Sequence, residues 1–101
     1  MEELVMNCAS ILLEKIPSIN KALDEAEKKF PKISETIKKQ KELLNEFSSY
    51  MTMIEKAQNP KEKQIIDRIQ FLLCRIDGQL QITITMIRRE ELAQKIGLRK
   101  L

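Results

Sequence analysis

The stretch VMNCASILLEKIPSINKALDEAEKKFPKISETIKKQKELLNEFSSYMTMI, residues 5–54, decides the fold. Apolar side chains recur along it in alternating steps of four and three residues, and the pattern never slips. The members of this stripe are Val5, Ala9, Leu12, Ile16, Ile19, Leu23, Ala26, Phe30, Ile33, Ile37, Leu44, Phe47, Met51 and Ile54, with the polar Gln40 filling one position. Such spacing puts the stripe on one side of an α-helix and is typical of helices that pack side by side.

Two prolines fall within the stripe. A proline in the interior of a helix costs about 3 kcal/mol, so each one predicts a local change of structure. We expect Pro31 to break the helix or make a tight corner at Phe30-Pro31-Lys32. We expect Pro17 to make a kink, or a short break capped by Ser18. If Pro31 only kinks the helix, the stripe belongs to one long hairpin that needs a second chain.

The second half of the chain has its own helix signals. Asn59 is a good N-cap, Pro60 suits the first helical position, and Glu62 can bond back to the cap. Gly97 lies where a left-handed residue commonly ends a helix. The apolar stripe between these signals is Ile65/Ile66, Ile69, Leu72/Leu73, Ile76, Leu80, Ile84 and Ile87. Residues 81–85 alternate as a strand would, but a lone strand would have no partner, so we predict helix there too.

These patterns predict an all-α fold in a single domain, residues 1–101. The helices are expected at about 2–29, 32–57 and 60–96, in an up-down-up antiparallel bundle. We expect the third helix to bend at Gly78 so that the three lengths match. A long kinked helical hairpin that dimerises is the alternative.

The composition argues against catalysis. The 101 residues include no histidine and two cysteines, Cys8 and Cys74, which lie far apart in sequence. Histidine bases and histidine metal ligands are therefore excluded, and two cysteines are too few for a zinc site. We expect no catalytic, cofactor-binding or metal-binding residues and predict that the protein is not an enzyme.

No secretory or membrane-spanning segment is apparent. The longest stretches without a charge, residues 4–13 and 78–87, are far shorter than the about 20 residues that span a bilayer. The N-terminus lacks the basic region of a secretory signal. We therefore expect a cytoplasmic protein that does not bind membranes.

Once catalysis and membrane insertion are set aside, the organised features of the sequence are its apolar helix stripes. They predict a protein–protein interaction module such as an adaptor, assembly chaperone or inhibitor. Its partner would be another protein or a second copy in a homo-oligomer. The candidate partner-binding residues are Leu43, Tyr50, Met53, Ile82 and Ile84.

The alternative is a small nucleic-acid-associated regulator. The net charge is +3, and the last part of the chain holds all five arginines. Basic residues near the C-terminus could contact phosphates. These candidates are Arg88, Arg89, Lys95, Arg99 and Lys100. Nucleic acid is not the favoured partner, because no aromatic side chain accompanies them for base stacking.

Overall fold

The computed structural model describes residues 2–56 and 62–100, and this part of the chain is helical almost throughout. Helix α1 runs from Glu2 to Lys29, and helix α2 from Ser34 to Glu55. A short 3-10 helix, η1 (Pro31–Ile33), joins them, and α3 extends from Lys63 to Lys100. The predicted all-α class is confirmed, and residues 81–85 are helical.

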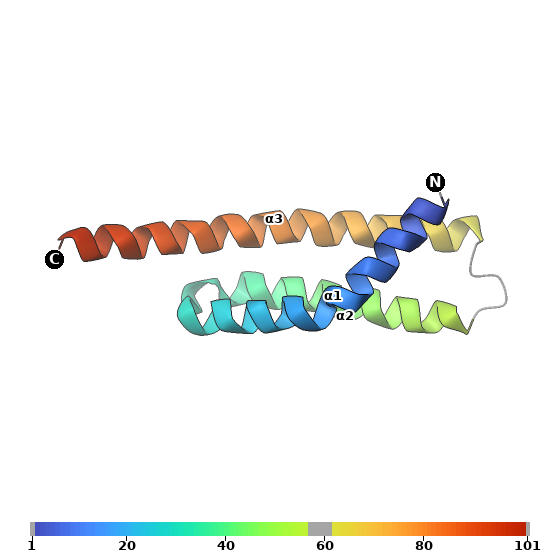
Figure 1. The fold of residues 1–101 in the computed structure, drawn as a ribbon, viewed down its shortest axis with the longest axis horizontal. Coiled ribbons are helices and arrows are strands. Elements are labelled where there is room, and N and C mark those ends of the chain that lie inside the picture. The colour runs from blue at the N-terminus through green and yellow to red at the C-terminus, as the bar shows by residue number, and fades with distance from the viewer. Residues whose placement is uncertain (1, 57–61, 101) are drawn as a thin grey trace.

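The helices form an up-down-up arrangement. Figure 1 shows α2 and the second half of α1 lying along the same side of α3, with α2 running in the opposite direction to the other two helices. The structure is elongated, with extents of 62 × 21 × 18 Å. Of the two predicted arrangements, the three-helix bundle is the one observed.

The corner between α1 and α2 lies where Pro31 predicted it. Phe30 leaves the helical conformation, with φ −130° and ψ 76°, and Pro31 begins η1. The Phe30 N–H still donates to the Ala26 carbonyl, and the Ile33 N–H donates to the Phe30 carbonyl at 3.1 Å. Both Phe30 and Ile33 are buried. Their burial fixes the corner against the bundle. Because Phe30 is not helical, Pro31 breaks the helix and does not merely bend it.

Pro17 has a different effect, because α1 is continuous through it. Figure 1 shows that α1 changes direction part-way along, so that its first half leans toward the beginning of α3. An interior proline is the commonest cause of a sharp helix bend. The kink, rather than the capped break, is therefore the observed outcome.

The stripe predicted from residues 5–54 forms the core on the α1 and α2 side. Val5, Ala9, Ile16 and Leu23 of α1 are buried, while the α1 members between them are half-buried. On α2 every member of the stripe is buried. The α2 members are Ile37, Gln40, Leu44, Phe47, Met51 and Ile54. The alternating pattern therefore identified the packed side of both helices.

Polar contacts join the helices at their edges. The Lys41 ammonium donates to the Asp24 carboxylate between α2 and α1. This hydrogen bond is the main reason why the pKa of Lys41 is raised above its ordinary value of 10.5. Arg68 of α3 donates to Glu46 of α2 at 3.0 Å. These pairs lie at the surface and contribute little to stability on their own.

The buried stripe of α3 differs from the prediction at one turn. Thr83 is fully buried, whereas Ile84 is 39% exposed. Steps of three and four from Ile69 through Leu72 and Ile76 lead to residue 83, so Ile84 lies one residue off the stripe. The Thr83 hydroxyl donates to the Gln79 carbonyl at 2.9 Å. Because this bond satisfies the hydroxyl, a threonine can occupy the core position.

The length of α3 agrees with the prediction, but its end and its course through Gly78 do not. The helix has 38 residues, Lys63–Lys100, and continues through Gly78 and past residue 96. Gly97 lies inside the helix with no positive φ, so the expected C-cap is absent. One helical glycine costs only about 1 kcal/mol relative to alanine, and no proline follows to end the helix. The predicted cap at Asn59 and Pro60 lies outside the described residues.

Candidate interaction surfaces

The most extended candidate surface is a second stripe on α3, which we call the outer stripe. Its members again alternate in steps of four and three, but they point away from the core. They are Phe71, Arg75, Gly78, Ile82, Thr85, Arg89, Leu92 and Ile96, and all eight are exposed. The four large apolar members, Phe71, Ile82, Leu92 and Ile96, are 45–59% exposed. The same spacing that packs α1 and α2 is thus repeated on a face that the bundle leaves open.

The outer stripe begins with an aromatic side chain between two cations. The guanidinium of Arg68 lies 5.5 Å from the centre of the Phe71 ring, and that of Arg75 lies 5.7 Å from it. Both distances are within the range of cation–π attraction. Arg68 is also held by its bond to Glu46. The ring is therefore oriented at the surface even though half of it is exposed.

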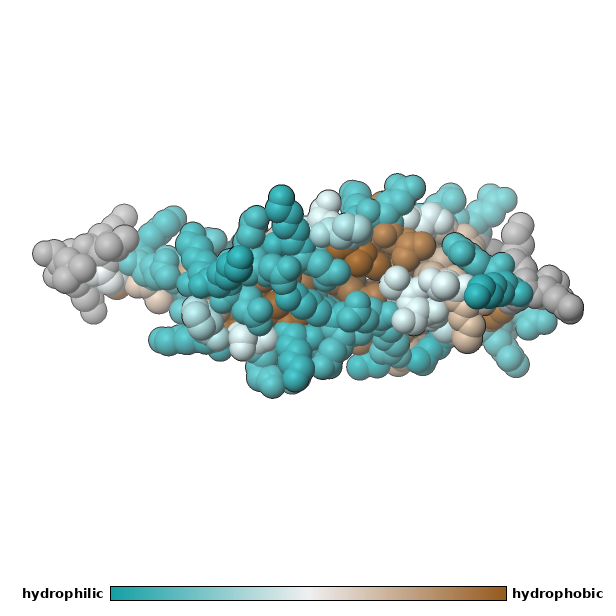
Figure 2. Space-filling model, turned by 90° about the horizontal axis from the view of Figure 1, so that it is seen from below, coloured by the Kyte–Doolittle hydropathy of each residue, from teal (hydrophilic) through white to brown (hydrophobic). Residues whose placement is uncertain are grey.

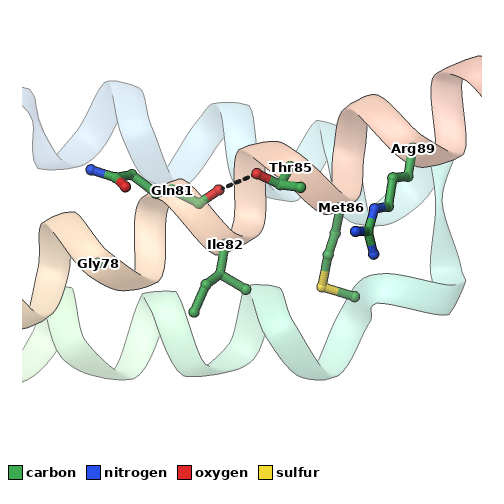
Figure 3. Close-up of a pocket in the computed structure, with 6 residues that line it drawn as sticks. All are labelled: Gly78, Gln81, Ile82, Thr85, Met86 and Arg89. Carbon is green, nitrogen blue, oxygen red and sulfur yellow. Dashed lines mark hydrogen bonds between the residues drawn. The ribbon is translucent and has the colours of Figure 1, made fainter.

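The middle of the outer stripe is hollowed. A depression of about 450 Å³ is lined by Gly78, Gln81, Ile82, Thr85, Met86 and Arg89, all from α3. Figure 3 shows the side chains of Ile82, Met86 and Arg89 extending to the same side of the helix. The Thr85 hydroxyl donates to the Gln81 carbonyl at 2.9 Å, so it is satisfied within the helix. Apart from its chain neighbours and the adjacent helix backbone, no described atom lies within 4 Å of where a Cβ at Gly78 would be.

The outer stripe carries basic charge in its C-terminal half. Arg89 belongs to the stripe, and Arg88 and Lys95 flank it. None of these three forms an ion pair with another described residue. Two acids belong to the same segment, because Glu90 directly follows Arg89 and Glu91 lines a surface depression together with Lys95. This half of the stripe therefore combines exposed apolar side chains with charges of both signs beside them.

The far end of α3 projects beyond the bundle. Figure 1 shows α3 continuing past the corner that joins α1 and α2. Every residue from 91 to 97 is exposed, including Leu92 and Ile96 of the outer stripe. Apolar side chains in this segment consequently have almost no packing within the chain.

A second, smaller surface lies between α1 and α2. Because α1 bends away, a groove of about 290 Å³ opens between the helices, lined by Met6, Ser10, Leu13, Met51, Ile54 and Glu55. Figure 2, which views the α1 and α2 side, shows hydrophobic side chains exposed within an otherwise hydrophilic surface. This groove is short, whereas the outer stripe runs for about 38 Å at 1.5 Å per residue.

The five predicted partner-binding residues do not form one surface. Leu43 and Tyr50 are half-buried and pack against the core, while Met53 is 61% exposed on α2. Ile82 belongs to the outer stripe. Ile84 is two residues away, about 200° around the helix, and therefore faces another direction.

The predicted phosphate-contacting residues are all on α3. Arg88, Arg89 and Lys95 are exposed. Arg99 and Lys100 belong to the last turn of the helix, and their side chains lie outside the described part of the structure.

Several features bear on other kinds of site. The thiols of Cys8 and Cys74 are exposed and not bonded to each other. No three metal-ligating side chains gather among residues 2–56 and 62–100. Within the same residues, no helix combines the length and apolar character needed to cross a bilayer.

The outer stripe was not predicted, because half of its members are polar or small. Its signal in the sequence is the return of large apolar residues to one helix face at Phe71, Ile82, Leu92 and Ile96. Comparison with models of protein families, with curated proteins and with solved structures finds no match to this chain. The interpretation of the surface therefore depends on its geometry and chemistry.

Proposed function

We propose that the chain is a non-enzymatic protein–protein interaction module, of the adaptor, assembly-chaperone or inhibitor type, that binds a partner helix along the outer stripe of α3. The observation that supports this most directly is that four large apolar side chains are exposed on one face of α3. They are Phe71, Ile82, Leu92 and Ile96. Helices pair by inserting side chains at such positions into the spaces of a facing helix. Monomeric proteins seldom expose long apolar stripes without using them.

The bundle supports this role by making α3 a rigid presenting element. Ile66, Ile69, Leu72 and Ile76 anchor its first half in the core. The outer stripe starts on this anchored part and continues onto the projecting end. A partner helix would therefore meet a surface whose first turns need little ordering, which lowers the entropic cost of binding.

Photo-crosslinking in the cells that make the protein tests this proposal. A photoreactive phenylalanine derivative at Ile82 would lie in the outer stripe, and the same derivative at Ile84 is the matched control on another face. We expect a discrete protein adduct from position 82 and little or none from position 84. Equal labelling from both positions, or none from position 82, would contradict the proposal.

A second candidate function is supported by the exposed Arg88, Arg89 and Lys95, which could contact the phosphates of a nucleic acid. Such binding would be independent of base sequence and would weaken steeply as salt rises. Replacing Arg88 and Arg89 by alanine should then weaken binding uniformly on all duplexes. Binding to a generic duplex that is undetectable, or that the double replacement leaves unchanged, would exclude this function.

A further inference from the structure

We infer that the outer stripe of α3 pairs with the same stripe of a second copy of the chain, running antiparallel, in a two-fold symmetric dimer. This inference rests on the proposed function and names the partner helix. Three features of α3 carry it: the order of large and small side chains along the stripe, the order of charges along its edges, and the position of the projecting end.

The spacing of the outer stripe is the same in both directions. Its steps from Phe71 to Ile96 read four, three, four, three, four, three and four whichever way the helix is followed. A two-fold axis that passes between residues 83 and 84 would therefore set every member opposite a member of the second copy. The opposed pairs are Phe71 with Ile96, Arg75 with Leu92, Gly78 with Arg89, and Ile82 with Thr85. In this register all eight members are covered, and no arginine faces an arginine.

The side chains opposed in the middle of this register differ in size. The long Arg89 faces Gly78, where an added Cβ would meet no described atom within 4 Å beyond its chain neighbours and the adjacent helix backbone. Ile82 faces the shorter Thr85. Large side chains opposite small ones let two helices interdigitate closely. The glycine therefore leaves space for the arginine of the second copy.

The depression in the outer stripe is centred on the same axis. Its volume is about 450 Å³, and its lining consists of Gly78, Gln81, Ile82, Thr85, Met86 and Arg89. The proposed axis exchanges these positions among themselves, 78 with 89, 81 with 86, and 82 with 85. Each copy therefore presents the same depression to the other. Ile82, which is 53% exposed in the single chain, would enter the depression of the second copy and lose contact with water.

Charges of both signs lie along the stripe in an order that an antiparallel copy complements. At 100° per residue, Asp77 and Arg88 lie on one edge of the stripe, whereas Arg75 and Glu90 lie on the other edge. In the proposed register, Arg88 of one copy and Asp77 of the second copy differ by only about 3 Å in their height along the helix, and so do Arg75 and Glu90. Parallel copies in register would instead set each charge beside its own kind, which is costly.

The antiparallel pairing also covers the projecting end of α3. The corner of the bundle lies near the middle of the stripe, because Thr36, shortly after η1, donates to the sulfur of Met86 at 3.2 Å. The second half of the stripe continues past the corner (Figure 1). In the dimer, each projecting half would lie along the anchored half of the other copy. Leu92 and Ile96, which are exposed in the single chain, would then be covered.

The dimer contact would be modest in size. It runs for about 38 Å at 1.5 Å per residue. The stripe and the positions directly beside it supply about 16 residues from each copy, fewer than the about 20–30 of a standard interface. We therefore expect a monomer–dimer equilibrium with Kd in the micromolar range.

Sedimentation of the full chain from about 1 to about 500 μM tests the pairing, and we expect the mass to rise from that of one chain toward that of two. I82E puts two glutamates close to the axis and should raise the dimer Kd at least about tenfold. The matched control I84E makes the same change on another face of α3 and should dimerise like the wild type. Both isoleucines are exposed, and circular dichroism establishes that both variants fold.

Mixing two charge variants tests the antiparallel register. D77R and R88E each set like charges against each other at both edge pairs of a dimer, so each variant alone should raise Kd about tenfold. An equimolar mixture should recover the affinity of the wild type, because in the mixed dimer the two altered residues oppose each other and the two unaltered ones do too. A mixture that associates no better than the separate variants would contradict this register.

Crosslinking locates the contact independently. The variants R75C and L92C are made in a chain whose exposed Cys8 and Cys74 are replaced by serine, and a short bismaleimide is added. We expect a crosslinked dimer only from the mixture, because equal positions of the two copies would be about 25 Å apart. Crosslinking of either variant alone would indicate parallel helices.

Other outcomes would overturn the inference. They are a single-chain mass at every concentration, a dimer that I82E and I84E weaken equally, and I82E-sensitive binding of a DNA duplex or of phosphatidylcholine and phosphatidylserine vesicles by a chain that stays monomeric. If position 82 forms its adduct in cells only with a different protein, the dimer inference fails while the proposed function stands. If position 82 gives no adduct, the proposed function itself fails.

Discussion

Replacing Gln40 by methionine should stabilise the protein. Gln40 is fully buried on α2, one turn from Ile37 and Leu44, which are fully buried too. Neither of its amide atoms has a hydrogen-bond partner among the described residues. A buried polar group without a partner costs about 1–3 kcal/mol, and an unbranched apolar side chain of similar size removes that cost. We therefore expect Q40M to gain about 2 kcal/mol.

The gain is measurable by urea denaturation followed by circular dichroism. With a slope of about 1–3 kcal/mol per molar urea, the unfolding midpoint should rise by about 1 M. In thermal unfolding, Tm should rise by roughly 8–16 °C, because each kcal/mol moves the Tm of a domain of this size by about 4–8 °C.

The control is Q70M, which makes the same change at an exposed position of α3. A surface substitution of this kind should change the free energy of unfolding by no more than about 0.5 kcal/mol. A midpoint for Q40M that is unchanged or lower would refute the reasoning, because it would mean that the amide is satisfied in solution. Sedimentation of Q40M should show the same mass as wild type, so that a gain does not come from new association.

Three other changes have definite expected outcomes. F47A removes a fully buried ring and should cost about 3–5 kcal/mol in urea denaturation, whereas F71A removes a half-exposed ring and should cost far less. D24N removes the carboxylate that raises the pKa of Lys41. Because the raised pKa stabilises the protein only while Lys41 is charged, the stability difference between wild type and D24N should persist from about pH 6 to 9 and close as pH rises through that pKa. G97A should increase the helicity measured by circular dichroism and favour the helix locally by about 1 kcal/mol, since the added Cβ meets no described atom within 4 Å beyond its chain neighbours and the adjacent helix backbone.

The local pattern of the sequence predicted most of the fold. The spacing from Val5 to Ile54 identified the packed side of α1 and α2, and Pro31 located the corner. These two predictions succeeded because the packed face of a helix and the effect of a proline both depend on residues that are close together along that helix. Ile84 was assigned to the core in place of Thr83 because hydrophobicity alone does not reveal that a threonine hydroxyl can bond to the preceding turn.

The candidate surfaces were less predictable. Leu43 and Tyr50 were predicted to bind a partner, but in the bundle they pack against the core. The groove between α1 and α2 depends on the direction taken after Pro17, which the sequence does not give. The outer stripe was present in the spacing from Phe71 to Ile96, yet only the placement of α1 and α2 shows that this side of α3 stays open.

The projecting end of α3 has a thermodynamic consequence. Residues 91–97 gain almost no stability from packing against the core. Their helical structure therefore depends on intrinsic helix propensity and on propagation from the anchored turns. A helical segment shorter than about 12 residues is marginal in water by itself. Amide hydrogen exchange should therefore be fast here and slow at Ile69 and Leu72, and part of the helical signal should melt before the cooperative transition. A ligand that binds this end would have to convert a helix–coil equilibrium into fixed helix. The affinity of such a ligand should therefore fall more steeply on warming than the affinity of a ligand that binds the anchored turns.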